Sequence, residues 1–138
     1  MRPKIVLANG CFDPFHYGHL LHLQAAKKLG DILIVSVTRD EFVNKGEGRP
    51  VLPDYKRAAT LAALRCVDAV MLTNSSYDAL MLVKPDIFVK GAEYRNRIDG
   101  ADKVLCEKII GIEIAFTDEE THSSTELLRY YDSQSRSR

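Results

Sequence analysis

The sequence predicts an α/β fold in which helices cover both faces of a sheet of five parallel strands. Short, continuous apolar runs are typical of strands buried on both faces, and they alternate along the chain with segments of helical periodicity. This regular alternation of strand and helix favours parallel over antiparallel pairing. A chain of 138 residues is also long enough to bury the core of one such domain.

The expected elements follow from the chain in order. The apolar runs place strands over Ile5–Ala8, Ile32–Val37, Ala69–Leu72, Ile87–Val89 and Glu113–Phe116. Helical periodicity places helices near Gly18–Leu29, Tyr55–Cys66, Tyr77–Val83 and Asp102–Ile109, with a last helix near Ser124–Tyr131. Gly30 favours the end of the first helix, and Pro85 separates the third helix from the strand after it.

Composition and charge argue against several function classes. The formal net charge is zero, which argues against a nucleic-acid or anionic-membrane partner, and no apolar run approaches the roughly 20 residues of a membrane span. Three cysteines without a C-x-x-C pair (Cys11, Cys66 and Cys106) favour a reducing cytoplasm over a disulfide framework. We expect one domain over residues 1–131 and a mobile tail over 132–138, because the tail has no apolar residue to bury.

The segment His16-Tyr-Gly-His19 stands between the first expected strand and the first expected helix. Two histidines three residues apart place both imidazoles on one side of the first helical turn, and Gly18 between them lets a ligand approach the backbone. A helix N-terminus favours anions through its free N–H groups and its dipole. The motif therefore predicts a site that holds a polyphosphate and stabilises charge on it, as nucleotidyl transfer requires.

Other interpretations of this motif are less favoured. A metal site would require a carboxylate or cysteine ligand nearby, and the sequence has no H-E-x-x-H arrangement, so no metal ligand is predicted. Asn9-Gly10 is also compatible with a hairpin turn, but the residues after it do not alternate like a returning strand and include Pro14. His22, one turn deeper, is expected to be a surface or hydrogen-bonded residue of the helix.

Basic residues cluster in the segment 44–57. They are Lys45, Arg49, Lys56 and Arg57. Gly46 and Gly48 let such a loop bend over a ligand, and cations neutralise the charge on transferring and leaving phosphates. Taken alone, such a cluster is more often a solvated charged loop. Together with the histidine pair, it favours a triphosphate site.

Two later segments add candidate ligands. Lys90-Gly91 follows the fourth strand, and it faces the histidines if the first and fourth strands are neighbours. An ordinary strand-to-loop turn at Gly91 is the alternative. The hydroxyl residues Ser123, Ser124 and Thr125 open the last helix, where they either hold phosphate or only cap the helix.

Together these motifs resemble the cytidylyltransferase-like nucleotidyltransferases. The similarity runs from residue 4 to about residue 130 and is carried by Gly10-Cys-Phe-Asp-x-x-His-x-Gly-His19, Lys45-Gly-Glu-Gly-Arg-Pro-Val51, Arg57, Ala62-Ala-Leu-x-Cys-Val-Asp68, Lys84-Pro-Asp-x-x-Val-Lys-Gly91 and Gly100-Ala-Asp102. The resemblance implies a Rossmann-like open sheet of five parallel strands. The segments are most similar to the adenylyltransferase domain of ADP-heptose synthesis, and next to glycerol-3-phosphate cytidylyltransferase.

The resemblance also implies a reaction. An oxygen of a sugar or polyol phosphate attacks the α-phosphate of a nucleoside triphosphate, which carries Mg2+, and pyrophosphate leaves. The implied catalytic residues are His16, His19, Lys45 and Arg57. The implied nucleotide-binding residues are Asn9, Gly10, Cys11, Phe12, Asp13, Gly18, Lys90, Gly91, Glu93, Ser123, Ser124 and Thr125.

We therefore expect a cytoplasmic adenylyltransferase that uses ATP and a heptose 1-phosphate, and a homodimer as in its relatives. A CTP-dependent enzyme acting on glycerol 3-phosphate is the alternative within the family, and a non-catalytic nucleotide-binding regulator is the alternative outside it. The sequence departs from the family pattern at Thr121, where relatives usually have glycine, and at Ser124, where they usually have threonine.

Overall fold

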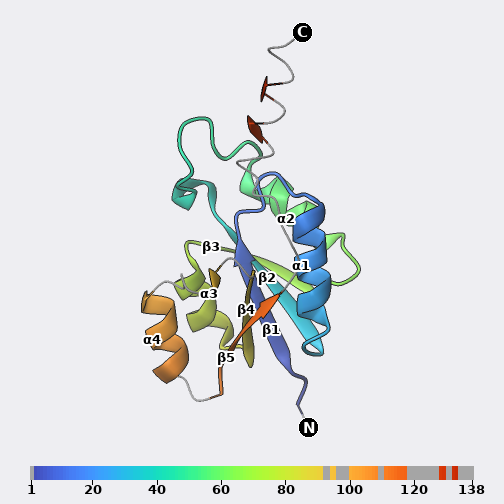
Figure 1. The fold of residues 1–138 in the computed structure, drawn as a ribbon, viewed down its shortest axis with the longest axis vertical. Helices are drawn as coiled ribbons and strands as arrows, with labels where there is room; N and C mark the ends of the chain where they lie inside the picture. The colour runs from blue at the N-terminus through green and yellow to red at the C-terminus, as the bar shows by residue number, and fades with distance from the viewer. Residues whose placement is uncertain are drawn as a thin grey trace.

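The computed structural model describes residues 2–91, 94–95, 100–108, 111–117, 128–129 and 132–133. Its strands form one sheet in the order β3-β2-β1-β4-β5, with parallel pairing throughout (Figure 1). The strands are β1 (Ile5–Gly10), β2 (Ile32–Thr38), β3 (Ala69–Thr73), β4 (Ile87–Gly91) and β5 (Glu113–Thr117). The predicted Rossmann-like α/β sheet is confirmed.

Helices cover both faces of this sheet, as predicted. They are α1 (Tyr17–Lys27), α2 (Asp54–Ala62), α3 (Ser76–Val83) and α4 (Gly100–Lys108), and the 3-10 helix η1 (Asp40–Phe42) follows β2. Successive strand residues point to opposite faces, so Val6 packs with Leu23 of α1, whereas Leu7 packs with Leu80 of α3. Helices α1 and α2 therefore cover one face, and α3 and α4 cover the other.

Most predicted boundaries lie within two residues of the observed ones. The exception is the helix predicted over Tyr55–Cys66, because α2 ends at Ala62. After it the chain forms a turn closed by the hydrogen bond from Val67 N to Leu64 O (3.2 Å), which brings Asp68 to the start of β3. Most of the predicted last helix, and most of the predicted tail over 132–138, lies outside the described residues.

The chain order reverses at β1, which has β2 on one side and β4 on the other. Ala8 pairs with Val35 of β2 and with Val89 of β4. In open parallel sheets, ligands bind outside the carboxyl ends of the strands at such a reversal. The first and fourth strands are thus neighbours, and the carboxyl end of β1 is the expected position of a site.

Three aspartates lie at the opposite end of the sheet, where the strands begin (called here its amino edge, and the end where the strands finish its carboxyl edge). Each directly precedes a strand, and its carboxylate accepts a hydrogen bond from a backbone N–H at the start of the neighbouring strand. The bonds run from Lys4 N to Asp31 (2.7 Å), from Leu33 N to Asp68 (2.8 Å) and from Ile5 N to Asp86 (2.8 Å). They satisfy N–H groups that the sheet ladder leaves over at its edge.

Cys11, Cys66 and Cys106 are free thiols. Among the described residues, no helix has the length and apolar character needed to cross a bilayer.

Candidate active site

The two histidines of the sequence motif lie side by side where β1 leads into α1. His16 is the N-cap of α1, and its Nδ1 accepts a hydrogen bond from Gly18 N (3.1 Å). His19 Nδ1 accepts in turn from His16 N (3.2 Å), so the two residues form a reciprocal capping box. Their rings stack with centroids 3.8 Å apart and planes at 24°. The spacing of the motif therefore produces the paired imidazoles that it predicts.

The capping bonds also determine where each neutral ring carries its proton. A backbone N–H can only donate, so Nδ1 of His16 and Nδ1 of His19 must both be acceptors. A neutral imidazole with an accepting Nδ1 carries its proton on Nε2. Each ring, when neutral, thus carries its N–H donor at Nε2.

His19 is neutral at physiological pH. Burial, together with the nearby His16, His22 and Lys45, lowers the pKa of His19 to about 3. Lys45, on the loop after η1, is the smallest of these influences on the pKa of His19.

Aromatic contacts hold His19 in this position. The ring of Phe12 meets His19 edge-to-face at 5.1 Å, and the ring of Phe15 stacks on it at 5.7 Å. Phe12 has a φ of 51°, a backbone conformation that is costly for a bulky residue and that recurs at functional sites. A Cβ at Gly10 would lie 3.1 Å from the Phe12 ring, so a side chain there would require the ring to shift by a few tenths of an ångström. Asn9 Oδ1 is buried and accepts no hydrogen bond from the residues that the structure describes, which leaves it available to a ligand.

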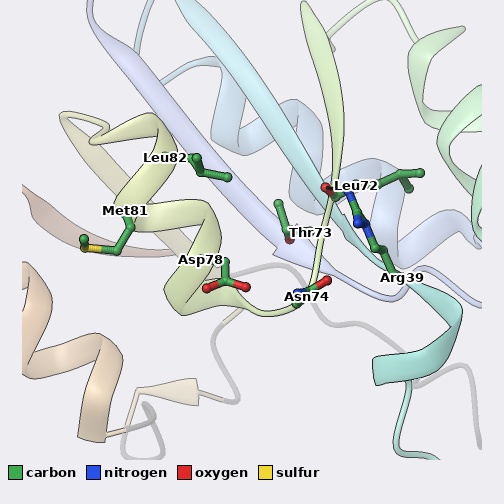
Figure 2. A pocket seen from close by; sticks show the side chains of 7 residues that line it. All are labelled: Arg39, Leu72, Thr73, Asn74, Asp78, Met81 and Leu82. Carbon is green, nitrogen blue, oxygen red and sulfur yellow. Dashed lines mark hydrogen bonds between the residues drawn. The ribbon is translucent and has the colours of Figure 1, made fainter.

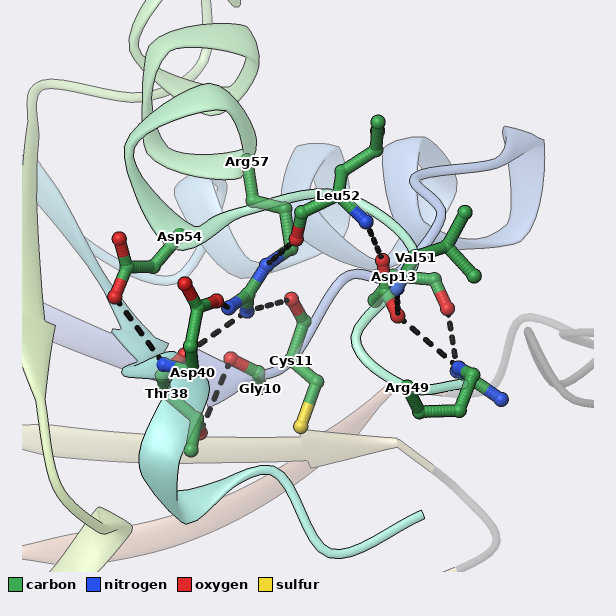
Figure 3. A network of polar contacts seen from close by, with 10 residues as sticks. All are labelled: Gly10, Cys11, Asp13, Thr38, Asp40, Arg49, Val51, Leu52, Asp54 and Arg57. Carbon is green, nitrogen blue, oxygen red and sulfur yellow. Dashed lines mark hydrogen bonds and ion pairs between the residues drawn. The ribbon is translucent and has the colours of Figure 1, made fainter. Parts of the chain in front are cut away.

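Asp13 is fully buried and is bonded to the loop that carries Lys45 (Figure 3). Its carboxylate accepts hydrogen bonds from Arg49 Nε (3.0 Å), Val51 N (2.7 Å) and Leu52 N (2.9 Å). Burial by itself raises the pKa of Asp13, but the N–H groups of Leu52 and Val51 and the guanidinium of Arg49 together lower it below its usual value. Asp13 is therefore an ionised group that contacts protein donors.

The guanidinium of Arg57 likewise hydrogen-bonds to other residues of the protein (Figure 3). Its side chain is 0% exposed, and its guanidinium donates to Leu52 O (2.9 Å), Cys11 O (2.8 Å), Thr38 O (2.9 Å) and Asp40 Oδ1 (2.7 Å). These acceptors come from the ends of β1 and β2, from η1 and from the loop before α2. This geometry favours a positioning role over the direct phosphate contact that the sequence suggested.

Lys45 differs from Arg57 in that it is exposed. It precedes Gly46 and Gly48, whose φ values of 98° and 78° belong to the region that favours glycine. A Cβ at either glycine would meet no atom within 4 Å, so both positions face open space.

Lys90 lies near the carboxyl end of β4, beside aromatic rings. Its Nζ is 5.1 Å from the centroid of Phe88 and 4.9 Å from that of Tyr94. Gly91 is the last residue of β4 and pairs with Thr117 of β5. The other predicted ligands, Glu93, Ser123, Ser124 and Thr125, and the family departure at Thr121, lie outside the described residues.

His22 is a hydrogen-bonded helix residue, one of the two outcomes expected for it. Its Nδ1 lies 2.8 Å from Thr117 Oγ1, and this contact joins α1 to the end of β5.

A separate pocket of about 350 Å³ lies between β3 and α3 (Figure 2). It is lined by Arg39, Leu72, Thr73, Asn74, Asp78, Met81 and Leu82. None of the predicted site residues lines it. One wall is fixed by the hydrogen bond from Arg39 Nη2 to Leu72 O (3.3 Å).

Two residues that build the site were missed as site residues in the sequence. Asp40 pairs with Arg57, and Arg49 pairs with Asp13. Arg49 stands out only as one of several basic residues in its loop, and Asp40 carries no sequence signal that we recognise.

Comparisons with known proteins identify the family of the chain. Residues 7–129 match the cytidylyltransferase-like family. The protein named bifunctional protein HldE is 44% identical over 119 residues in Campylobacter jejuni subsp. doylei, 46% over 104 in Nitratiruptor sp. and 48% over 98 in Helicobacter pylori strain P12. These matches cover 83%, 72% and 68% of this chain, but only 26%, 22% and 21% of the relatives. The chain thus spans about a quarter of the length of the curated relatives it matches.

Solved structures show the same fold. The lipopolysaccharide core biosynthesis protein from Thermoplasma volcanium GSS1 superposes with a TM-score of 0.73 at 31% identity, over 87% of this chain and 100% of that one. A protein of unknown function from Archaeoglobus fulgidus, at 20% identity and a TM-score of 0.62, shares the fold over 88% of this chain and 96% of its own.

Proposed function

We propose that this chain, which belongs to the cytidylyltransferase-like family, transfers a nucleotidyl group from a nucleoside triphosphate to a sugar phosphate and releases pyrophosphate. ATP and a heptose 1-phosphate are the proposed substrates. The resemblance of the motifs to the adenylyltransferase domain of ADP-heptose synthesis supports this choice, as does the similarity to bifunctional protein HldE and to a lipopolysaccharide core biosynthesis protein. We further propose the cytoplasm as its location and a homodimer as its assembly.

The observation that carries the proposal is the stacked histidine pair with both Nδ1 atoms occupied by backbone N–H groups. Two Nε2–H donors at a helix N-terminus match the oxygens of a phosphate chain. In the proposed reaction, a phosphate oxygen of the acceptor attacks the α-phosphorus in line with the departing pyrophosphate. Negative charge then spreads over the α-phosphoryl oxygens, and preorganised donors stabilise this charge without reorganising.

A neutral His19 suits this role. Two protonated imidazoles with centroids 3.8 Å apart would repel each other, whereas a neutral His19 stacks on His16 and still donates. The positive charge that the triphosphate requires comes instead from Lys45, on the loop, and from Lys90, at the end of β4.

Magnesium enters with the triphosphate as part of the substrate. Among the described residues, no group of three or more histidine, cysteine, aspartate or glutamate side chains lies close enough to hold a metal ion. The phosphate oxygens would therefore supply most of its ligands, as is usual for Mg2+ bound to nucleotides. The ion would neutralise charge on the leaving pyrophosphate.

A substrate panel tests the proposal. Pyrophosphate release is measured with ATP, CTP, GTP and UTP, each combined with heptose 1-phosphate, glycerol 3-phosphate and other sugar phosphates, with and without Mg2+. We expect turnover with ATP and heptose 1-phosphate. A strong preference for CTP with glycerol 3-phosphate would replace the adenylyltransferase with the cytidylyltransferase alternative. Binding of ATP without turnover of any acceptor would instead favour a nucleotide-binding regulator.

A further inference from the structure

Asp13 lies three residues before His16, but the structure directs its carboxylate toward the loop that contains Lys45. Three donors from the Arg49–Leu52 segment reach this one carboxylate. Arg49 Nη2 also donates to the backbone carbonyl of Asp13 (2.5 Å), and the Arg49 side chain is only 7% exposed. The segment is thus held against the histidine loop by a buried ion pair and two backbone N–H groups.

The same segment is held from its other side. Leu52 donates its N–H to Asp13 and accepts at its carbonyl from Arg57, and Arg57 donates to Cys11 O, two residues before Asp13. These bonds form a closed circuit between the histidine loop, the Arg49–Leu52 segment and the first turn of α2 (Figure 3). The position of Arg49–Leu52 is therefore fixed relative to His16 and His19.

Lys45 depends on this attachment because the residues between it and Arg49 make few contacts. Gly46 and Gly48 have open surroundings, and residues 44–48 are all exposed. The turn from Gly46 to Arg49, closed by Arg49 N and Gly46 O (3.3 Å), connects the fixed segment to the lysine. The positive charge of Lys45 is also the smallest of the causes that lower the pKa of His19.

We propose that Asp13 is a positioning residue that holds the Arg49–Leu52 segment and thereby places Lys45 beside the histidine pair for the triphosphate. The proposal rests on the nucleotidyl-transfer function proposed above. It assigns Asp13 to the loop instead of to the direct nucleotide contact implied by the family resemblance.

The chemistry of the bonds selects the variant. Asp13→Asn keeps the volume but replaces one accepting oxygen with an NH2 group. One carboxylate oxygen accepts from both Arg49 and Val51, and the other accepts from Leu52. Either orientation of the asparagine therefore sets donor against donor and releases part of the segment.

The test is a double-mutant cycle with Lys45. We expect Asp13→Asn to lower kcat/KM for MgATP by about 10- to 100-fold, as for loss of a charge-assisted contact, with the KM for the sugar phosphate unchanged. In a Lys45→Ala background, the same substitution should change kcat/KM by less than about twofold, because the residue through which it acts is gone. Equal losses in both backgrounds would overturn the proposal.

A matched control separates positioning from general stability. Asp86 is also an aspartate that accepts from one arginine, Arg2, and from a backbone N–H, but it lies at the amino edge of the sheet. Asp86→Asn should leave kcat/KM for MgATP within about twofold of the wild type. If Asp13→Asn does not fold, Arg49→Ala replaces it in the cycle and should show the same dependence on Lys45, with a smaller loss.

A readout that needs no substrate keeps this proposal distinct from the proposed function. Trypsin cleaves after the exposed Lys45 faster when the loop becomes more mobile, and mass spectrometry measures the rate. We expect faster cleavage at Lys45 in Asp13→Asn than in the wild type and in Asp86→Asn. Equal cleavage rates in all three proteins would overturn the positioning role, whatever the substrate panel shows.

Discussion

The two edges of the sheet use charged side chains in opposite ways. At the amino edge, Asp31, Asp68 and Asp86 accept backbone N–H groups while remaining near solvent. At the carboxyl edge, Asp13 and Arg57 are buried with their charges, and their partners come from segments far apart in the sequence. The first arrangement completes the hydrogen bonding of the strands, whereas the second fixes loops that the sheet itself does not hold.

This difference shows where function has shaped the fold. Burying a charge is costly unless every donor or acceptor around it is satisfied, so a buried ion pair is weak evidence for stability alone. Here both buried charges hold the segments around the histidine pair. Removing charged groups from each edge in turn tests this contrast.

Arg57→Ala should have the largest effect. It leaves the carbonyls of Cys11, Thr38 and Leu52 without their donor, and we expect the free energy of unfolding to fall by about 3–5 kcal/mol. Urea denaturation measures this loss. Arg57→Lys keeps the charge but cannot reach four acceptors, so its free energy of unfolding should lie between those of the wild type and Arg57→Ala. An unchanged unfolding midpoint for Arg57→Ala would show that these bonds do not hold the carboxyl edge together.

His16→Ala and His19→Ala should each lower the turnover rate. Removing one preorganised donor to transition-state charge costs about 10²–10³ in turnover, or roughly 3–4 kcal/mol. The fold should survive, because loss of a helix cap typically costs only about 1 kcal/mol. Turnover is measured by pyrophosphate release, and circular dichroism checks the fold. A loss below about tenfold would give the histidines a peripheral role.

The pH dependence of stability should report the buried imidazole. Between about pH 6.5 and pH 3 the unfolded chain binds a proton that folded His19 does not, because the pKa of His19 is lowered to about 3. Stability should therefore fall as the pH falls through this range, by at most about 1.4 kcal/mol per pH unit. His19→Asn should be less sensitive when unfolding is compared at pH 7 and pH 5. Parallel losses in both proteins would assign the dependence to other groups.

Asp86→Asn should have the smallest effect. Its carboxylate is near solvent, and hydrogen bonds from Arg2 and Ile5 N lower the pKa of Asp86. We expect the melting temperature to fall by only about 2–4 °C, with kcat unchanged. Differential scanning calorimetry measures the shift. A change in kcat as large as that of the histidine variants would remove the distinction between the two edges.

The sequence predicts the sheet well because strands buried on both faces must be continuous apolar runs. The sequence also contains signals for side-chain contacts that the predictions did not include. Each amino-edge aspartate stands directly before such a run, so the pattern of an aspartate followed by an apolar run occurs three times along the chain. Arg57 precedes Leu61 by four residues on the buried face of α2, which indicates that its side chain points into the protein.

Other features of the site require the folded chain. The capping box of α1 has histidine where the usual pattern has glutamate or glutamine, so the sequence pattern does not reveal it. The positive φ of Phe12 is unusual for a bulky residue and follows from packing around His19. The partners of Asp13 lie more than 35 residues away in sequence, and local propensity does not specify them.

Helix α1 has a further consequence for how substrates enter. It begins with the histidine pair beside β1, and His22 then binds Thr117 at the end of β5, on the other half of the sheet. A hinge motion that separated the two halves would break this contact, which therefore favours movement of the helix together with both halves. Access to the site would then depend on local rearrangement of surface segments such as the exposed residues 44–48.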